Sequence, residues 1–413
     1  MVRIRPFRAV RPAEGFAEKV AALPYDVMTS DEARAMAGDK PLSFLHIDRG
    51  EIDLPEGTDP YAPEVYAKAK ENLEREISEG VFLQDETPRF YVYRLTMDGR
   101  PQTGLVCCAS IDDYESGVIK KHELTRADKE EDRVRHVDTL DANTGPIFLA
   151  GRRNDGFSAF LDKAVSGNPV YDFTADDGVR HEAWLIDEEE NEGVISVFKG
   201  MDALYIADGH HRCASAARVG KLRREQDPGG TGEEEYNFFL AVVFPEEQLK
   251  ILDYNRAAAD LNGLTKEEIL AKLEESFIVE PYAGKGPARP SEKHRFGMYL
   301  DGLWYLLTAR PGLVDDADPV TRLDVSVLQD HVLAPVLGIE DPRTDKRVDF
   351  IGGIRGLSEL ERRVDSDMKV AFAMYATTMD DLFDIADAGL IMPPKSTWFE
   401  PKLRSGLFIH KLK

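Results

Sequence analysis

Apolar side chains recur with a helical period in one early stretch of the chain. Residues 60–79 carry an apolar side chain at every fourth position from Val65 to Ile77. This spacing places them on one face of an α-helix, and Gly80 supplies a residue suited to ending it. The pattern therefore predicts an amphipathic helix that packs against a core.

Other stretches show the patterns of strands. Residues 90–96 and 103–110 flank the turn dipeptide Asp98-Gly99 and predict a β-hairpin. Residues 203–207 form a short apolar run, and residues 238–244 form a continuous one, which predicts a strand in the centre of a sheet. Further helices are expected over 29–36, 125–142, 212–219, 265–277, 357–364 and 379–388, and further strands over 2–10, 146–150, 182–186, 295–300, 304–309, 370–375 and 406–410.

This mixture of helices and hairpins, without an internal repeat, predicts an α+β (mixed α/β) fold. A chain of 413 residues is too long for one simple core, so several domains are expected. We expect an N-terminal α/β region, a core, a small inserted helix–hairpin module, and a C-terminal α/β region that completes the site. Their expected ranges are 1–145, 146–255, 256–330 and 331–413.

Composition and charge exclude several classes of function. Acidic residues outnumber basic ones by 76 to 52, giving a net charge of −24, which argues against a nucleic-acid partner. No uninterrupted apolar stretch approaches the ~18 residues of a membrane span. The three cysteines, Cys107, Cys108 and Cys213, have neither disulfide nor zinc spacing, so we expect a cytoplasmic protein without a membrane partner.

The densest group of chemically active residues is the segment 207–216, Ala-Asp-Gly-His-His-Arg-Cys-Ala-Ser-Ala. A strand leads to Gly209, which permits a sharp turn, and a helix then begins with free amides that attract anions. Arg212 can grip a phosphate, and His210 and His211 add donors or a proton shuttle. The alternative is a buried turn whose histidines satisfy backbone carbonyls. The phosphate-binding or catalytic residues expected here are Asp208, Gly209, His210, His211, Arg212 and Ser215.

A second group lies in the predicted helix after residue 125. Lys129, Arg133 and His136 are spaced to share one face, which suits a polyphosphate. Glu123 or His122, just before the helix, could act as a general base. The alternative is an ordinary solvated helix with ion pairs.

Two loops offer weaker signals. Asp26 stands in the rigid turn Pro24-Tyr-Asp-Val27, where it could orient a hydroxyl or bind a metal, although a capped loop is the simpler alternative. Lys395 and Ser396 lie in a basic, hydroxyl-rich loop suited to an anion or to a solvated tail. The chain has no Walker A, GxGxxG, HExxH or GxSxG motif, so the common nucleotide, dinucleotide, zinc-protease and serine-hydrolase sites lose support.

The strand–Asp-Gly-His-His-Arg–helix segment resembles the second signature box of the ParB/sulfiredoxin superfamily, whose members hold nucleotide phosphates in that turn. It is more closely similar to archaeal free serine kinases of the SerK type. The chain as a whole resembles a bacterial and archaeal family of unknown function. That resemblance covers nearly the full length and rests on the segments 24–27, 120–125, 129–136, 208–212 and 394–397.

The resemblance implies a ParB/sulfiredoxin-like nucleotide-binding core and a phosphotransferase, most simply a free L-serine kinase. The donor would be ATP, ADP or pyrophosphate, with its phosphates on the 208–212 turn. Lys129, Arg133 and Lys395 would neutralise charge on the transferred group. Glu123 or Asp26 would accept the proton of the hydroxyl. Mg²⁺ is expected, with Asp208 as a ligand.

Three other functions stay open at this stage. One is a nucleotide-binding regulatory switch without turnover, and another is a phosphohydrolase that uses the same site. The third is a metal-dependent enzyme with His122, His136, His210 and His211 as ligands. The sequence does not give the donor, the acceptor, the general base or the oligomeric state, for which a homodimer is one option.

Overall fold

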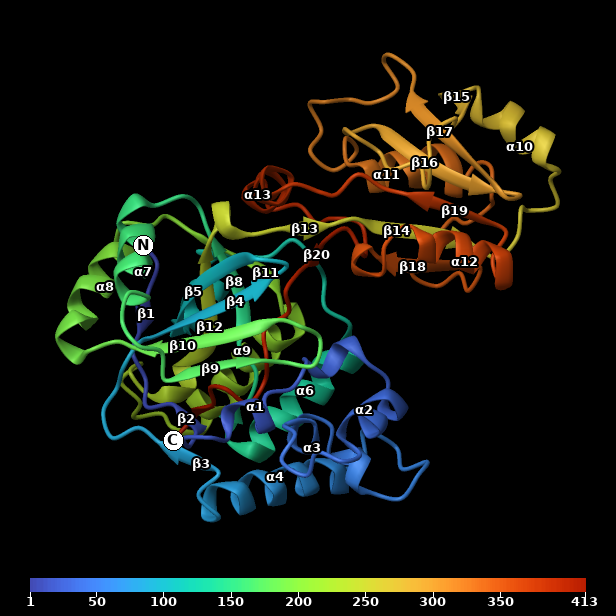
Figure 1. The fold of residues 1–413 in the computed structure, drawn as a ribbon. Coiled ribbons are helices and arrows are strands. Elements are labelled where there is room, and N and C mark those ends of the chain that lie inside the picture. Colours follow the sequence, from blue (N-terminus) through green and yellow to red (C-terminus); the bar gives the residue numbers. More distant parts are fainter. The chain divides into compact units, whose positions relative to one another are not determined.

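The computed structural model describes all 413 residues, which form two compact units (Figure 1). The first unit comprises Met1–Leu249 together with Pro401–Lys413, and the second comprises Lys250–Glu400. The chain therefore leaves the first unit once and returns to it for its last residues. The protein has a mixed α+β fold, as the sequence predicts.

A nine-stranded mixed sheet forms the centre of the first unit. Its order is β6-β11-β8-β12-β5-β4-β10-β9, with β1 paired to β5. The pairs β11–β6 and β12–β8 are parallel and the others are antiparallel. The strands are β1 (Ile4–Arg5), β4 (Tyr91–Met97), β5 (Arg100–Ser110), β6 (Ile119–Lys120), β8 (Ile147–Gly151), β9 (Tyr171–Thr174), β10 (Arg180–Leu185), β11 (Leu204–Asp208) and β12 (Phe238–Pro245).

Every residue of β12 is buried, and this strand lies in the middle of the sheet, as its continuous apolar run predicts. β4 and β5 form the predicted hairpin, with Asp98 and Gly99 in the left-handed conformation that the turn requires. Two short sheets complete the strands of this unit, β2 (Val10–Pro12) with β3 (Phe82–Gln84) and β7 (Ala142–Asn143) with β21 (His410–Lys411).

Helices α4, α6 and α9 form a packed series in the first unit, with α6 in contact with both others. α4 (Pro63–Ser78) turns the predicted apolar stripe inward, and α9 (His210–Gln226) follows β11 directly. The helices and 3-10 turns of this unit are α1 (Ala17–Val20), Tyr25–Val27, α2 (Ser30–Ala37), α3 (Leu45–Asp48), Gly50–Asp53, α4, α5 (Ile111–Glu115), α6 (Ala127–Leu140), α7 (Asp155–Ala164), Glu188–Glu190, α8 (Asn191–Lys199), α9, Glu235–Asn237 and Glu246–Gln248.

The second unit has its own antiparallel six-stranded sheet, in the order β15-β17-β16-β19-β14-β18, and a separate pair β13–β20. β16 and β17 form the predicted hairpin. The strands are β13 (Ile251–Leu252), β14 (Tyr254–Ala258), β15 (Phe277–Pro281), β16 (Arg295–Leu300), β17 (Leu303–Ala309), β18 (Val348–Gly352), β19 (Val370–Ala373) and β20 (Trp398–Phe399). The helical segments are α10 (Lys266–Leu273), α11 (Asp324–Leu328), the π-turn Gln329–Leu333, the 3-10 turn Gly353–Arg355, α12 (Ser358–Ser366) and α13 (Met379–Asp387).

The four expected segments do not coincide with the two units, because strands pair across their boundaries. β5 lies before residue 145 and pairs with β12, which lies after it. β16 of the expected inserted module pairs with β19 of the expected C-terminal region. The final residues belong to the first unit, where β21 pairs with β7.

Some expected elements have different bounds. The helix expected over 265–277 ends at Leu273, and Phe277 begins β15. The strand expected over 2–10 is split into β1 and β2, and Pro6, which lacks an N–H, stands between them. α9 continues to Gln226, well beyond the expected end at Val219. The last strand is only His410–Lys411. No helix of the protein has the length and apolar character needed to cross a membrane.

Candidate functional site

The strand–turn–helix expected at the Asp208–Arg212 segment is present. β11 ends at Asp208, Gly209 has φ 94° and ψ 31°, and α9 begins at His210. A Cβ atom at Gly209 would lie 3.2 Å from Nε of Arg212, whose guanidinium folds back over the turn. Glycine is therefore required twice, by the left-handed backbone and by the approach of Arg212.

Asp208 is engaged by a cation from the end of the chain. Nζ of Lys402 donates a hydrogen bond to Oδ2 of Asp208 over 2.9 Å. Burial would raise the pKa of Asp208, but the charges of Lys402 and Arg212 hold it well below its ordinary range. Mg²⁺ takes carboxylate oxygens as ligands. The ammonium of Lys402 stands against one oxygen of this carboxylate, so the metal-binding role expected for Asp208 stays a prediction that rests on Oδ1.

Arg212 is held by the protein but forms no ion pair. Its Nη1 donates to the carbonyl of Pro146 over 2.5 Å, while its buried Nε has no hydrogen-bond partner. Burial would lower the pKa of Arg212, but the nearby acids, Asp26 and Asp208 first, raise it above its ordinary value. The guanidinium is therefore a permanent positive charge at the start of α9.

Two cavities lie on either side of a common wall formed by Tyr25, Asp48, Arg133 and His136. The smaller one, of about 20 Å³, reaches Arg212 and has room for about one water molecule. The larger one, of about 290 Å³, opens between α2, α4 and α6. The larger cavity is the main candidate site of the first unit.

α6 supplies four side chains to this larger cavity, Lys129, Asp132, Arg133 and His136. Lys129, Arg133 and His136 are the three whose spacing predicts a shared face. Lys129 donates to the hydroxyl of Tyr61 over 2.8 Å. Arg133 pairs with Asp132 at 2.9 Å, and its guanidinium lies 4.0 Å from the centre of the Tyr25 ring.

His136 is buried on the common wall. Its Nε2 donates to the carbonyl of Ile47 over 3.0 Å. Burial and the charge of Arg133 lower the pKa of His136 to about 4. His136 is therefore a neutral hydrogen-bonding group at physiological pH and does not add positive charge for an anion.

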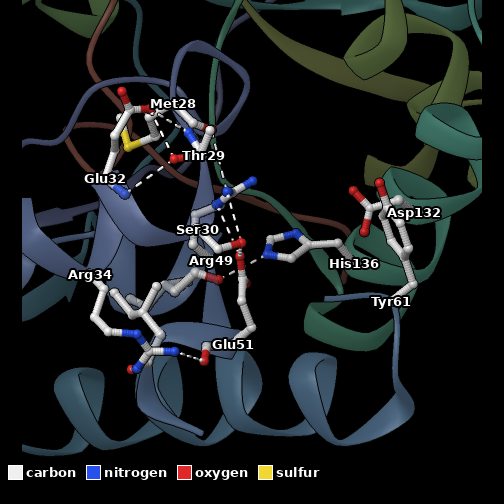
Figure 2. Close-up of polar contacts among 12 residues, drawn as sticks. Met28, Thr29, Ser30, Glu32, Arg34, Arg49, Glu51, Tyr61, Asp132 and His136 are labelled. Carbon is white, nitrogen blue, oxygen red and sulfur yellow. Dashed lines mark hydrogen bonds and ion pairs between the residues drawn. The ribbon is translucent and has the colours of Figure 1, made fainter. Parts of the chain in front are cut away.

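Ser30, Arg49 and Glu51 line the same cavity and form a small network (Figure 2). The hydroxyl of Ser30 donates to Oε1 of Glu51 over 2.9 Å, and Nη2 of Arg49 donates to that hydroxyl over 3.2 Å. Arg49 also pairs with Glu51 at 3.1 Å. Three bases, Arg49, Lys129 and Arg133, and three acids, Asp48, Glu51 and Asp132, therefore line one cavity. Such a lining suits a small ligand that carries both signs of charge.

The loops after β6 and β11 meet because the two strands run parallel and side by side. His122 and His210 follow these strands, and their ring centres are 4.6 Å apart. Oε2 of Glu123 lies 3.9 Å from Nδ1 of His210. Burial lowers the pKa of His122 to about 4 and holds that of His210 well below its ordinary value.

The other predicted residues of the first unit have defined places. The backbone N–H of Arg126 donates to Nε2 of His211 over 3.0 Å, which joins the two loops. Ser215 is buried, lines the small cavity, and donates to the carbonyl of Arg212 over 3.0 Å. Asp26 is exposed, and its charge acts on the pKa of both His211 and Arg212.

Lys395 and Ser396 belong to the second unit. Ser396 is buried and donates to the carbonyl of Pro393 over 2.7 Å. Nζ of Lys395 lies 5.9 Å from the ring centre of Tyr254. These contacts all lie within that unit, so the role of Lys395 and Ser396 in phosphate binding stays a prediction.

Residues 4–326 of the chain match a protein family described as a protein of unknown function, DUF1015. The protein is a member of the DUF1015 family. No curated protein matches it.

Solved structures similar to this DUF1015 protein are distant. A free serine kinase in complex with AMP has 13% sequence identity and a TM-score of 0.36, with 74% of this chain and 91% of that chain covered. A conserved hypothetical protein from Pyrococcus furiosus has 13% identity and a TM-score of 0.34, with 74% and 94% covered. SbnI from Staphylococcus aureus, truncated at its C-terminus, has 11% identity and a TM-score of 0.37, with 71% and 82% covered.

Several residues of the DUF1015 protein's site do not follow from the sequence patterns considered above. Ser30, Asp48, Arg49 and Glu51 line the larger cavity, although their segment shows no catalytic motif. The charged run Asp48-Arg-Gly-Glu51 is the only local signal, and the burial of both its acids marks it as unusual.

Proposed function

We propose that this protein is a phosphotransferase that moves a phosphoryl group from a nucleotide or pyrophosphate to the hydroxyl of a small zwitterionic molecule, with free L-serine as the first candidate. The observation that carries the proposal is the wall shared by two cavities, the larger with three acids and three bases in its lining and the smaller reaching Arg212 and Ser215 of α9. A donor and an acceptor bound on either side of this wall would lie close together.

The larger cavity supports a zwitterionic acceptor. Arg49 and Lys129 could receive a carboxylate, and Glu51 and Asp132 could receive an ammonium. A volume of about 290 Å³ is at the small end of ligand sites, which favours an amino acid over a larger substrate. In this cavity, Arg49 pairs with Glu51 and Arg133 pairs with Asp132, so none of these four charges is buried alone. A bound zwitterion would take the place of one partner in such a pair.

The start of α9 supports an anionic donor. Its free backbone amides, together with the helix dipole of a 17-residue helix, favour phosphate oxygens. The space beside Arg212 is only about 20 Å³, so a phosphate requires the guanidinium to leave the carbonyl of Pro146. The exchange replaces one charge-assisted hydrogen bond by another that is at least as strong.

Three carboxylates are candidates for the general base. Asp48 lies on the common wall, and Thr144 donates to its Oδ1 over 2.9 Å. Glu123 is half-exposed beside His210, and Asp26 is exposed near Arg212. Substituting each by its amide separates the three, because loss of the true base lowers kcat while leaving acceptor binding in place.

Phosphorus NMR of the purified protein tests the proposal. The protein is incubated with L-serine, Mg²⁺ and, in separate samples, ATP, ADP or pyrophosphate, since such donors bind with Mg²⁺ on their phosphates. A new phosphomonoester signal that requires serine supports the proposal. Donor hydrolysis at a rate that serine does not change would instead identify a phosphohydrolase. Tight nucleotide binding with no product from any donor would identify a regulatory nucleotide-binding protein.

A further inference from the structure

His122, Glu123 and His210 form a compact group of metal-binding side chains at the carboxyl ends of β6 and β11. One ligand atom from each residue lies within 4.8 Å of the other two. The parallel pairing of β6 and β11 places the loops that follow them side by side. The backbone of the sheet therefore brings the three residues together.

The two imidazoles have unmet bonding capacity. His122 is 1% exposed and His210 is 6% exposed. Neither ring nitrogen of His122 has a hydrogen-bond partner, and neither has Nε2 of His210. Burying such a group without a partner costs about 1–3 kcal/mol. A ligand that accepts the nitrogen lone pairs would remove this cost.

Other buried histidines of the chain do not share this property. Nε2 of His136 donates to the carbonyl of Ile47, Nδ1 of His181 bonds the hydroxyl of Tyr93, and Nε2 of His410 bonds Glu235. Unpartnered imidazole nitrogens thus occur in this protein where two histidines and a glutamate converge.

We propose that His122, Glu123 and His210 bind one divalent transition-metal ion, of which Zn²⁺ is the first candidate. Two imidazoles and a carboxylate form a three-ligand set that leaves a fourth position for water or an anionic oxygen. Nitrogen ligands favour Zn²⁺ and similar ions over Mg²⁺, which prefers oxygen. Tetrahedral bonds of about 2.0–2.1 Å place ligand atoms roughly 3.3 Å apart, so modest side-chain rotations would complete the site.

The surroundings of His122 fit this role. A histidine that binds a metal usually donates its other ring N–H to a carbonyl or carboxylate. Asp208 is close enough for its carboxylate charge to act on the His122 ring. An ion held here would stand at the start of α9. The proposal does not depend on phosphotransfer, because metal binding is measured without nucleotide or serine.

Metal binding by the full chain tests the proposal. The protein is stripped with a chelator and titrated with Zn²⁺ by calorimetry and with Co²⁺ by visible absorption, which reports the geometry of the bound ion. We expect one ion per chain and a tetrahedral Co²⁺ spectrum. His122→Asn and His210→Asn should each weaken binding by at least about 100-fold, since even the loss of an outer partner typically costs 10–100-fold.

Two further variants keep the result interpretable. Glu123 is 42% exposed, so Glu123→Gln should fold normally and still weaken binding. His181→Asn removes a buried histidine outside the group and should leave the affinity unchanged. Circular dichroism confirms that each variant is folded. The proposal is wrong if the wild-type protein binds Co²⁺ no more tightly than the folded Glu123→Gln variant, or if His181→Asn weakens binding as much as His122→Asn does.

Discussion

Arg212 lies between two glycines at the start of α9. A Cβ atom at Gly145 would lie 3.5 Å from Nη1 of Arg212, and one at Gly209 would lie 3.2 Å from its Nε. Both positions therefore keep space for the guanidinium. A residue larger than glycine at position 209 would displace the Arg212 guanidinium and so move the positive charge at the turn.

Gly209→Ala tests that displacement. A left-handed backbone costs a residue with a Cβ roughly 1–2 kcal/mol, so the variant should lose about that much unfolding free energy in urea. Gly117 also has a positive φ, of 79°, but a Cβ there meets nothing within 4 Å. Gly117→Ala should lose similar stability while keeping nucleotide affinity, whereas Gly209→Ala should lose both. Equal nucleotide affinity in the two variants would contradict the role given to Arg212.

His136 predicts a pH dependence of stability. Its pKa is about 4 in the folded protein, below the ordinary value of about 6.5. The unfolded chain therefore binds more protons between these values, and stability falls as the pH falls from about 6.5 to about 4. His136→Gln can keep a donor for the Ile47 carbonyl without titrating. Urea unfolding at pH 7 and pH 5 should show a smaller loss for the variant than for the wild type, and equal losses would exclude this contribution.

At the scale of elements, the start of α2 shapes the larger cavity. Thr29 and Glu32 form a capping box, which fixes the first turn of the helix. Ser30 follows the cap and lines the cavity beside Glu51. The cap therefore helps to position a residue that lines the cavity.

Thr29→Ala should cost about 1 kcal/mol of unfolding free energy and should also weaken acceptor binding. Thr265 forms the same kind of capping box at α10 in the second unit. Thr265→Ala should carry a similar cost in stability without the loss of binding. Calorimetric titration of L-serine into both variants distinguishes the two effects. If the two variants bind serine equally well, α2 does not shape the acceptor site.

Sequence patterns predict the elements that depend only on neighbouring residues. The β4–β5 hairpin follows from its Asp98-Gly99 turn, and the α4 stripe follows from its period. α9 extends past its expected end because Arg223–Gln226 are good helix formers, and the glycine pair Gly229-Gly230 lies beyond them.

The candidate site is predictable only in part, for the same reason. One helical face carries Lys129, Arg133 and His136, so their spacing alone places them together. Asp48 and Glu51 reach the same cavity from a distant segment, and only the folded chain brings them there. Lys402 likewise meets Asp208 across 194 residues of sequence, which no local pattern encodes.

At the scale of the whole molecule, long-range pairing defines the two units. The last residues return to the first unit, where β21 pairs with β7 and Lys402 reaches Asp208. A boundary of this kind depends on contacts between segments far apart in the sequence, and composition along the sequence carries little trace of it. Both cavities and the His122–Glu123–His210 group are built by residues of the first unit.

The rate of serine-dependent phosphomonoester formation in two arginine variants of α9 tests the central claim most directly. Arg212 stands at the proposed donor site, whereas Arg218 lies on the same helix, is 44% exposed and pairs with Glu130 and Glu131. We predict that Arg212→Ala lowers the rate by at least about 100-fold, as expected for a group that meets the transferred charge, and that Arg218→Ala leaves it nearly unchanged. Product formation by Arg212→Ala at the wild-type rate, or no product from the wild-type protein with any of the three donors, would contradict the account.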